Sequence, residues 1–490
     1  MIERLSTWTV LLLLCCFSFT AQSGNTLVQG NAFYYKGKTI EIHRYLDLFT
    51  FETALLDKQV IPQNGAFKFN VDVSETGLYV LKIQNIHAHV YLEPGNEYTL
   101  VLSEPLEEER YGPAKDVFIL PEVFESESQL NHHITEIEKT INRFLIDNSK
   151  YYGRSVSRQI LPLADSLIML LNAQYGDHPN RFLRKHLHYR LATFEIQTNH
   201  SRNQIYQRYF SSHALEYDQL SFAQGFGLFY DEYLSYLNPK QEHRFIEEAE
   251  EALKQTDFNA LYDALAVDPH LQRKDIRELV LATELYELGI EKKYPQSNIR
   301  VLLDSLIMRA QDQECKIIAA NAEQILNRLA PGTLAPDFQF SDLFGNIFRL
   351  KEYQGRYIYI QFFDDFDAET LKEMSLMKVL KEGYGTDIAM FSISTEASLA
   401  KMRDISGDYH FNWYFGKAMN HDQLVDQYQL RAFPSYFYLN KDLEIIVSPA
   451  PPPGSRIERL FAKAWNEEHP NKELLFKLQP PEVEEEEMPK

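Results

Sequence analysis

Alternation of apolar and polar residues characterises the first part of the chain. Between Phe67 and Val73 every second residue is apolar, and this run follows directly on an Asn64-Gly65 turn. A period of two is typical of strands with one buried face. Similar strand signals occur at residues 40–42, 79–83, 88–92 and 98–102. Short strands at this spacing predict a small β-sandwich over residues 24–103, followed by an acidic, proline-containing linker over residues 104–121.

The apolar period becomes helical after residue 122. Leu130, Ile134, Ile137 and Ile141 are spaced to lie on one face of a helix. Comparable segments are separated by proline-containing breaks near residues 179, 239 and 295. We therefore predict an α-helical bundle over residues 122–330, with no repeat period of the kind that marks a solenoid.

Strand signals return in the last third of the chain. Residues 357–363 and 388–393 are continuous apolar and aromatic runs, and a helical segment follows each. Such runs are typical of strands buried on both faces, so we predict a mixed sheet flanked by helices over residues 331–468. Residues 469–490 contain Pro480-Pro481 and an acidic run without an apolar face, which predicts a disordered tail. The expected fold class is α+β with several domains.

Length and charge narrow the function classes. A chain of 490 residues exceeds the size at which one core keeps growing, so two or three domains are expected. The net charge of -21 argues against nucleic-acid binding, which depends on lysine and arginine releasing counterions from phosphates.

The first 23 residues have the features of a signal peptide. Arg4 lies in a short polar start, an apolar stretch runs from Trp8 to Phe19, and positions 21 and 23 are small. Nothing later reaches the ~20 apolar residues of a membrane helix, so no transmembrane segment is expected. Leu14 precedes Cys15, where a lipoprotein signal requires a small residue, so lipid anchoring is not expected. We predict an exported protein of the periplasm or cell envelope.

Cysteine content restricts redox chemistry. Removal of residues 1–23 also removes Cys15 and Cys16, which leaves Cys315 as the only cysteine. One thiol can form neither an internal disulfide nor a cycling dithiol, and it cannot build a cysteine-based zinc site. A lone cysteine on a helix is usually a small buried hydrophobe.

Several motifs in the last third resemble one known family. Residues from Gly332 to about Trp465 resemble the TlpA/ResA-like thioredoxin domains of exported bacterial proteins, over less than a third of the chain. In Bacteroidetes-type members a β-domain and a helical middle often precede this domain, and the present organisation is similar. The motifs are Gly332-x-x-Ala335-Pro336-Asp337-Phe338, Asp342-x-x-Gly345, Leu350-x-x-Tyr353-x-Gly355-Arg356 and Tyr428-x-Leu430-x-x-Phe433-Pro434-Ser435.

The resemblance breaks at the family's Trp-Cys-x-x-Cys motif. Phe366 stands at the tryptophan position, Asp367 at the nucleophilic cysteine and Thr370 at the resolving cysteine. Thiol–disulfide exchange needs an attacking thiolate and a second thiol, which Asp and Thr cannot replace. The resemblance therefore implies a redox-inactive member, and an enzyme is not favoured. The alternative is a thiol–disulfide oxidoreductase with atypical or residual activity through Cys315 or a thiol of its partner.

Asp367 has three interpretations. Aspartate is a preferred helix N-cap, and the favoured interpretation is that Asp365 or Asp367 is simply such a cap. Alternatively, the carboxylates of Asp364, Asp365, Asp367 and Glu369 could bind calcium or magnesium, although no spaced loop supports it. A carboxylate-based hydrolase is the third, with no visible pairing of base and nucleophile.

Pro434 carries the strongest functional implication of the resemblance. In the family this loop contains a cis-proline, faces the catalytic site and pairs with the backbone of a bound polypeptide. Phe366, Asp367, Phe433 and Pro434 are accordingly the candidate binding groove, with a polypeptide or a cell-envelope component as partner. The residues leave open the alternative that the turn serves folding alone.

Histidine pairs are the remaining candidates for chemistry. His87-x-His89, His186-x-His188 and His132-His133 lack a nearby carboxylate at ligand spacing, so we expect packed or solvated imidazoles rather than a zinc site. No phosphate-binding glycine loop, nucleophile elbow or metalloprotease motif is present. We expect neither a metal nor another cofactor.

Overall fold

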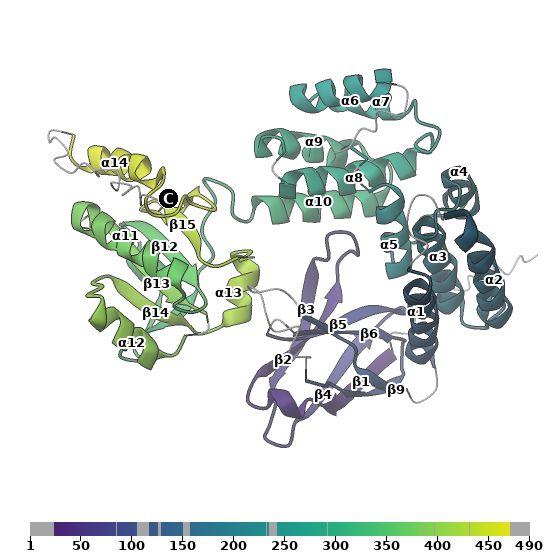
Figure 1. The fold of residues 1–490 in the computed structure, drawn as a ribbon, viewed down its shortest axis with the longest axis horizontal. Coiled ribbons are helices and arrows are strands. Elements are labelled where there is room, and N and C mark those ends of the chain that lie inside the picture. The colour runs from purple at the N-terminus through teal and green to yellow at the C-terminus, as the bar shows by residue number, and fades with distance from the viewer. Residues whose placement is uncertain are drawn as a thin grey trace, which may run out of the picture.

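The computed structural model has three regions in chain order: two β-sheets, a stack of helices and a mixed α/β region (Figure 1). The predicted signal peptide, most of the predicted linker and nearly all of the predicted tail lie outside the described residues. The described residues are 24–84, 86–104, 117–125, 129–149, 157–231, 233–234, 243–291, 293–385, 387–395, 397–430 and 432–470.

The N-terminal β-region consists of two sheets around one core. One sheet has the strand order β4-β1-β7-β9 and the other the order β3-β2-β5-β6-β8. Burial alternates strictly along β4, as its sequence predicts, because one face meets the core and the other meets water. The strands are β1 (Gly24–Asn31), β2 (Thr39–Tyr45), β3 (Thr53–Val60), β4 (Ala66–Val73), β5 (Gly77–Ile83), β6 (Ile86–Leu92), β7 (Glu97–Val101), β8 (Val117–Ile119) and β9 (Glu122–Glu125).

Strands β8 and β9 correct the predicted end of the β-region. β8 lies in the predicted linker and pairs with β6, and β9 lies where a helix was expected and pairs with β7. Both strands have three or four residues, too few for an alternating pattern to be recognised in the sequence.

The helical region follows and shares its core with part of the β-region. Leu48, Leu78 and Tyr91 of the β-region belong to the same buried cluster as the apolar face of α1. The predicted face of α1 is confirmed, because Leu130, Ile134, Ile137 and Ile141 are all buried. The helices are α1 (Leu130–Asp147), α2 (Ser157–Tyr175), α3 (Arg181–Gln197), α4 (Arg202–Ile205), the π-helical turn η4 (Tyr206–Phe210), α5 (Leu220–Phe229), α6 (His243–Gln255), α7 (Phe258–Leu265), α8 (Lys274–Glu291), α9 (Gln296–Arg309) and α10 (Gln313–Asn327).

Specific polar contacts hold the β-region against the helices. The buried side chain of Asn131 on α1 bonds to both the N–H and the C=O of Tyr91 at 2.8 Å, as a neighbouring strand would. At the other end of the stack, Arg328 forms an ion pair with Glu52 at 3.0 Å. Both contacts join segments far apart in the sequence.

The C-terminal region is a seven-stranded mixed sheet in the order β11-β10-β14-β13-β12-β15-β16. Strands β12, β13 and β14 are parallel, and β15 runs antiparallel to β12. The predicted mixed sheet flanked by helices is confirmed. Its elements are β10 (Gln339–Asp342), β11 (Ile347–Arg349), the 3₁₀ turn η5 (Leu350–Tyr353), β12 (Tyr357–Phe363), α11 (Ala368–Tyr384), β13 (Ile388–Ser394), α12 (Leu399–Asp408), β14 (Tyr414–Ala418), α13 (His421–Gln427), β15 (Ser435–Leu439), β16 (Ile445–Val447) and α14 (Ile457–Glu468).

Strand β12 lies at the centre of this sheet and is buried on both faces. Ile358, Ile360 and Phe362 contribute to the core cluster that also contains residues of α13, such as Leu424. Tyr359 points to the opposite cluster, beneath α11 and α14. Within the described residues, no helix is both long and apolar enough to cross a membrane.

Candidate functional site

Three loops meet at one edge of the C-terminal sheet. Phe363 at the end of β12 pairs with Ser394 at the end of β13, and Phe362 pairs with Ser435 at the start of β15. The segments that continue from these strands therefore emerge together. Residues 364–370, 394–395, 397–398 and 432–435 are called the loop cluster below. The backbone oxygen of Asp364 joins the first segment of this cluster to the second. It accepts hydrogen bonds from the Ala397 N–H at 3.0 Å and from the Ser394 hydroxyl at 2.8 Å.

Asp367 caps the helix that begins in the loop cluster. It is the N-cap of α11, and its Oδ1 accepts a hydrogen bond from the Thr370 N–H at 2.7 Å. The favoured interpretation of Asp367 as a capping residue is confirmed. Thr370 is buried below the cap with 1% exposure, whereas Asp367 is exposed to solvent. A carboxylate thus occupies the helix start, where amide N–H groups and the helix dipole favour negative charge.

The neighbouring acidic residues are engaged by protein groups. Both carboxylate oxygens of Asp365 bond to the Lys401 ammonium, at 2.5 and 2.7 Å. This hydrogen bond lowers the pKa of Asp365 below its ordinary value. Phe366 is half-buried and packs edge-on against Phe363 at 5.0 Å between ring centroids. Among the described residues no group of His, Cys, Asp and Glu side chains is arranged to hold a metal, so the divalent-cation interpretation gains no support.

The proline loop lies beside this helix start. The Phe433–Pro434 peptide bond is cis, and Ser435 immediately begins β15. Phe433 packs against the core cluster of β12, and Pro434 is half-buried. Since Ser435 is paired with Phe362, the structure brings Pro434 to the same edge of the sheet as Asp367, as the resemblance implies.

A line of buried hydrogen bonds crosses the sheet beneath the loop cluster. The Trp413 indole donates to the Ser392 hydroxyl at 2.9 Å, and this hydroxyl donates to the Gln361 amide oxygen at 2.7 Å. The Gln361 amide then donates to the Tyr436 hydroxyl at 2.7 Å, which donates to the Glu373 carboxylate at 2.6 Å. Ser392, Gln361 and Tyr436 occupy directly paired positions on three adjacent strands. The line therefore connects the sheet interior to α11.

Sequence reasoning missed this line. Its signal is Gln361, the one polar residue within the apolar run of residues 357–363. Gln361 is fully buried, and buried polar groups need partners, so such a residue predicts a polar network across the sheet.

Glu373 ends the line in an acidic environment. Burial raises the pKa of Glu373 above its ordinary value of 4.5, and the nearby carboxylates of Glu369 and Asp367 add to the effect. The Tyr436 hydrogen bond acts in the opposite direction. The start of α11 thus carries more carboxylates than cations.

Cys315 lies in α10, in the helical region, and is fully buried. Its sulfur contacts the Tyr217 hydroxyl at 3.3 Å, and burial raises the pKa of the thiol well above its ordinary value. The expectation of a small buried residue is confirmed. A buried thiol with a raised pKa supplies little of the thiolate on which exchange depends.

The histidine pairs remain separate from this site. His89 bonds to the Tyr45 hydroxyl at 2.7 Å, and His186 lies 3.5 Å from Glu138. The rings of His132 and His133 lie in a tilted contact at the start of α1, with 5.7 Å between their centroids. These contacts are those of packed side chains within the β-region and the helices.

The parallel strands β12, β13 and β14, the antiparallel β15 and the cis-proline before β15 together define a thioredoxin-like fold in the C-terminal region. No family model matches the chain, and no curated protein matches it. Solved structures with partial likeness exist.

Several of these structures come from Bacteroides. One is a candidate thiol-disulfide oxidoreductase from Bacteroides vulgatus, with 23% identity over 28% of this chain and 98% of that chain, and a TM-score of 0.27. The thioredoxin domain of another Bacteroides vulgatus thiol-disulfide oxidoreductase has 20% identity over 24% of this chain and 87% of that chain, with a TM-score of 0.23. A thiol:disulfide interchange protein from Bacteroides sp. has 20% identity over 24% of this chain and 81% of that chain, with a TM-score of 0.23.

The cap of α11 yields the first testable prediction. Asp367→Ala removes the acceptor of the Thr370 N–H and should lower the free energy of unfolding by roughly 1 kcal/mol. Asp367→Asn, which keeps a capping oxygen, should stay within about 0.5 kcal/mol of wild type. Urea unfolding followed by circular dichroism measures both. Equal effects of the two variants would contradict the assigned cap.

The raised pKa of Glu373 predicts how the stability of the fold depends on pH. Because its folded pKa is raised, the folded state binds more protons than the unfolded state at pH values above the ordinary pKa of 4.5. This carboxyl therefore stabilises the fold least at high pH. The free energy of unfolding falls as the pH rises from about 4.5 through the raised pKa of Glu373. Glu373→Gln should remove this part of the slope, and Glu382→Gln, at an exposed position of α11, should keep it. Urea midpoints from pH 4 to 7.5 measure the slopes; identical slopes in all three proteins would exclude the effect.

Proposed function

We propose that this protein is an exported, redox-inactive thioredoxin-like protein that binds an extended polypeptide at the loop cluster. The observation that supports this proposal most directly is the capping contact of Asp367. At the position where the resembled family has its attacking thiol, this chain has a carboxylate that accepts a hydrogen bond from the helix backbone. The sequence has no cysteine after Cys315, so the whole thioredoxin-like region lacks sulfur nucleophiles.

Polypeptide binding is supported by the backbone beside the cis-proline. Strand β16 pairs only with Tyr438 and Leu439 of β15, and no described strand pairs with residues 432–434. The Ala432 C=O accepts from the Ser435 hydroxyl at 2.5 Å and Pro434 has no N–H, so an extended chain would pair with the N–H and C=O of Phe433. The half-buried Phe366 supplies an apolar contact next to this backbone.

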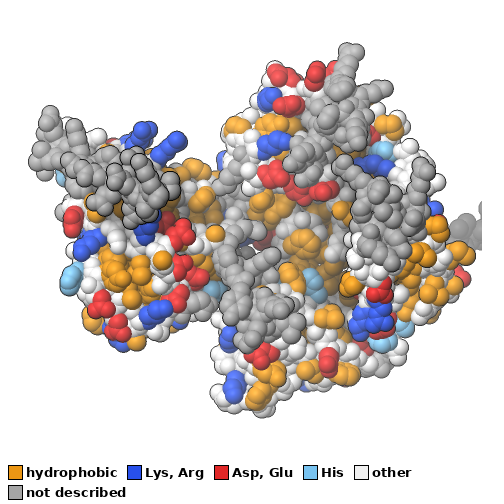
Figure 2. Space-filling model, in the orientation of Figure 1, with side chains coloured by type: hydrophobic (Ala, Val, Ile, Leu, Met, Phe, Trp, Pro, Cys, Tyr) orange, Lys and Arg blue, Asp and Glu red, His pale blue; other side chains and the backbone are white. Residues whose placement is uncertain are grey.

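Charge indicates the chemistry of the partner. Asp367 and Glu369 are exposed at the helix start, and Glu373 lies one turn further along α11. Lys401 offsets the charge of Asp365, and Lys372 on α11 is a cation close to Glu373. Figure 2 shows hydrophobic side chains at the surface of the C-terminal region between groups of acidic ones. A partner segment with alternating basic and apolar residues would complement such a surface.

The remaining organisation belongs to the same proposal. The features of residues 1–23 favour export to the periplasm or cell envelope, without lipid anchoring. The β-sandwich and the helical domain would act as the scaffold that carries the thioredoxin-like domain of residues 331–468. The protein would then be a TlpA/ResA-like member that has lost its dithiol.

An enzymatic assay separates this proposal from the alternative of residual oxidoreductase activity. The mature chain should reduce insulin disulfides no faster than the buffer with dithiothreitol, because no accessible thiol is present. Cys315→Ser should give the same rate as wild type. A rate above buffer that Cys315→Ser abolishes would establish the alternative instead.

A binding assay tests the polypeptide site. An octapeptide of alternating lysine and valine should bind the mature chain in fluorescence anisotropy, and its glutamate–valine counterpart should not. Glu369→Lys in the loop cluster should weaken binding at least about fivefold, because it reverses a charge within a Debye length of the groove. Glu382→Lys makes the same charge change farther along α11 and should alter affinity less than about twofold.

The two glutamate variants also show which results would contradict the polypeptide-binding proposal. Equal weakening by both would mean that net charge attracts the peptide without the loop cluster. Absence of saturable binding to wild type would contradict polypeptide recognition at this site.

A further inference from the structure

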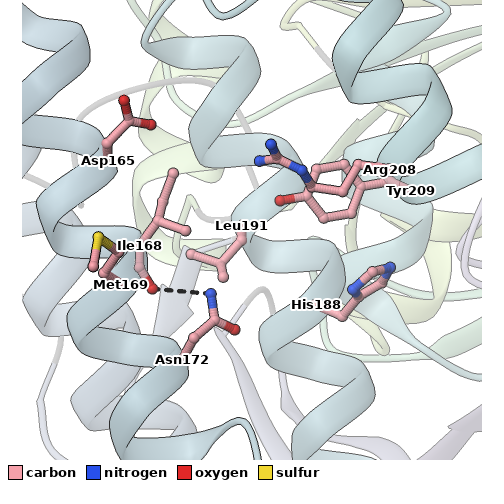
Figure 3. A pocket seen from close by; sticks show the side chains of 8 residues that line it. All are labelled: Asp165, Ile168, Met169, Asn172, His188, Leu191, Arg208 and Tyr209. Carbon is pink, nitrogen blue, oxygen red and sulfur yellow. Dashed lines mark hydrogen bonds between the residues drawn. The ribbon is translucent and has the colours of Figure 1, made fainter.

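A cavity in the helical region lies outside the site described so far. It has a volume of about 530 Å³, which is within the range of pockets that hold small ligands. Helices α2 and α3 form its walls, and the π-helical turn η4 closes one side (Figure 3). The lining residues are Asp165, Ile168, Met169, Asn172, His188, Leu191, Arg208 and Tyr209.

The middle of the cavity is apolar, and polar side chains lie at its edges: Asp165 and Asn172 on α2, and His188, Arg208 and Tyr209 on α3 and η4 (Figure 3). Ile168 and Met169 of α2 face Leu191 of α3 across it in Figure 3. The side chains of Arg208 and His188 lie together on the side of α3 and η4. This arrangement suits a ligand with an apolar body and one polar end group.

Arg208 has donors left over for a ligand. Its Nη1 bonds to Oε1 of Glu195, a residue with no exposed surface, and the Tyr209 hydroxyl donates to the same oxygen at 2.8 Å. A guanidinium carries five N–H donors, and this one bonds to Glu195 and to the Tyr209 hydroxyl, so some of its donors remain. The Arg208 side chain is 51% exposed, so these donors are accessible.

His188 presents a second polar group that lacks a partner. Its Nε2 is buried and makes no hydrogen bond among the described residues. Burial, together with the nearby His213 and Arg208, lowers the pKa of His188 to about 4, so the ring is neutral near pH 7. A neutral imidazole can donate one hydrogen bond without requiring a counter-ion.

The π-helical turn places these groups. Arg208 and Tyr209 are consecutive residues, yet both reach Glu195 and both line the cavity. Single π-helical turns are rare and occur frequently at functional sites. The turn and the unsatisfied Nε2 of His188 are independent observations that meet on the α3 and η4 side of the cavity.

We propose that this cavity binds an aliphatic monocarboxylate. The apolar chain lies against Ile168, Met169 and Leu191, and the carboxylate accepts hydrogen bonds from the free N–H groups of Arg208. Glu195 disfavours a dianion such as a phosphate, because it already places a carboxylate on the single guanidinium, whereas Asp165 is paired with His200. An alkylammonium ligand would place its charge next to Arg208 and is disfavoured for that reason.

Calorimetry with the mature full-length chain tests the proposal, with octanoate as probe and octanol and octylamine as controls. Octanoate should bind saturably, and octanol at least about tenfold more weakly, because a charge-assisted hydrogen bond is lost. Glu195→Gln keeps the shape of the buried side chain and removes the competing anion, so it should tighten octanoate binding.

The double variant Arg208→Met with Glu195→Gln leaves no buried unpaired charge and should lose octanoate binding by about tenfold or more. Arg300→Gln removes an exposed arginine of α9 and should leave affinity unchanged. Thermal melting by circular dichroism verifies that each variant is folded. The proposal is overturned if octanol binds as tightly as octanoate, if the folded double variant retains affinity, or if wild type shows no binding to octanoate.

Discussion

The site depends on the burial of strand β12 on both faces at the centre of the C-terminal sheet. Because β12 is paired on one side with β13 and on the other with β15, its last residues fix where three loops emerge. Side chains of β12 alternate between two core clusters, so a one-residue shift in register would reverse every contact. The one polar residue of the strand, Gln361, is satisfied only in this register, through Ser392 and Tyr436.

Under the proposal that this protein has lost a dithiol, a carboxylate at the thiol position changes the chemistry and preserves the structure. Asp367 satisfies a backbone N–H of α11 that would otherwise lack a partner, and its charge is favoured at a helix N-terminus. In the proposed function, the same carboxylate replaces the sulfur on which disulfide exchange depends. The loop cluster would then keep its negative charge and retain recognition without catalysis.

Local signals in the sequence predicted much of this structure. The capping role of Asp367 follows from residue preference, and the apolar run of β12 follows from burial on both faces. Strands β8 and β9 were missed because three or four residues carry no readable period. The line from Trp413 to Glu373 and the cavity beside Arg208 were missed for another reason. Each joins residues that only strand register or helix packing brings together.

Hydrogen–deuterium exchange of the full mature chain with and without the lysine–valine octapeptide tests the central claim most directly. The account predicts protection in segments that cover residues 364–370 and 432–435, where the bound chain would engage the backbone beside β15, and unchanged exchange in the helical region. Protection confined to the β-region or the helices, or no protection at saturating peptide, would contradict the claim that the thioredoxin-like region is a polypeptide-binding module.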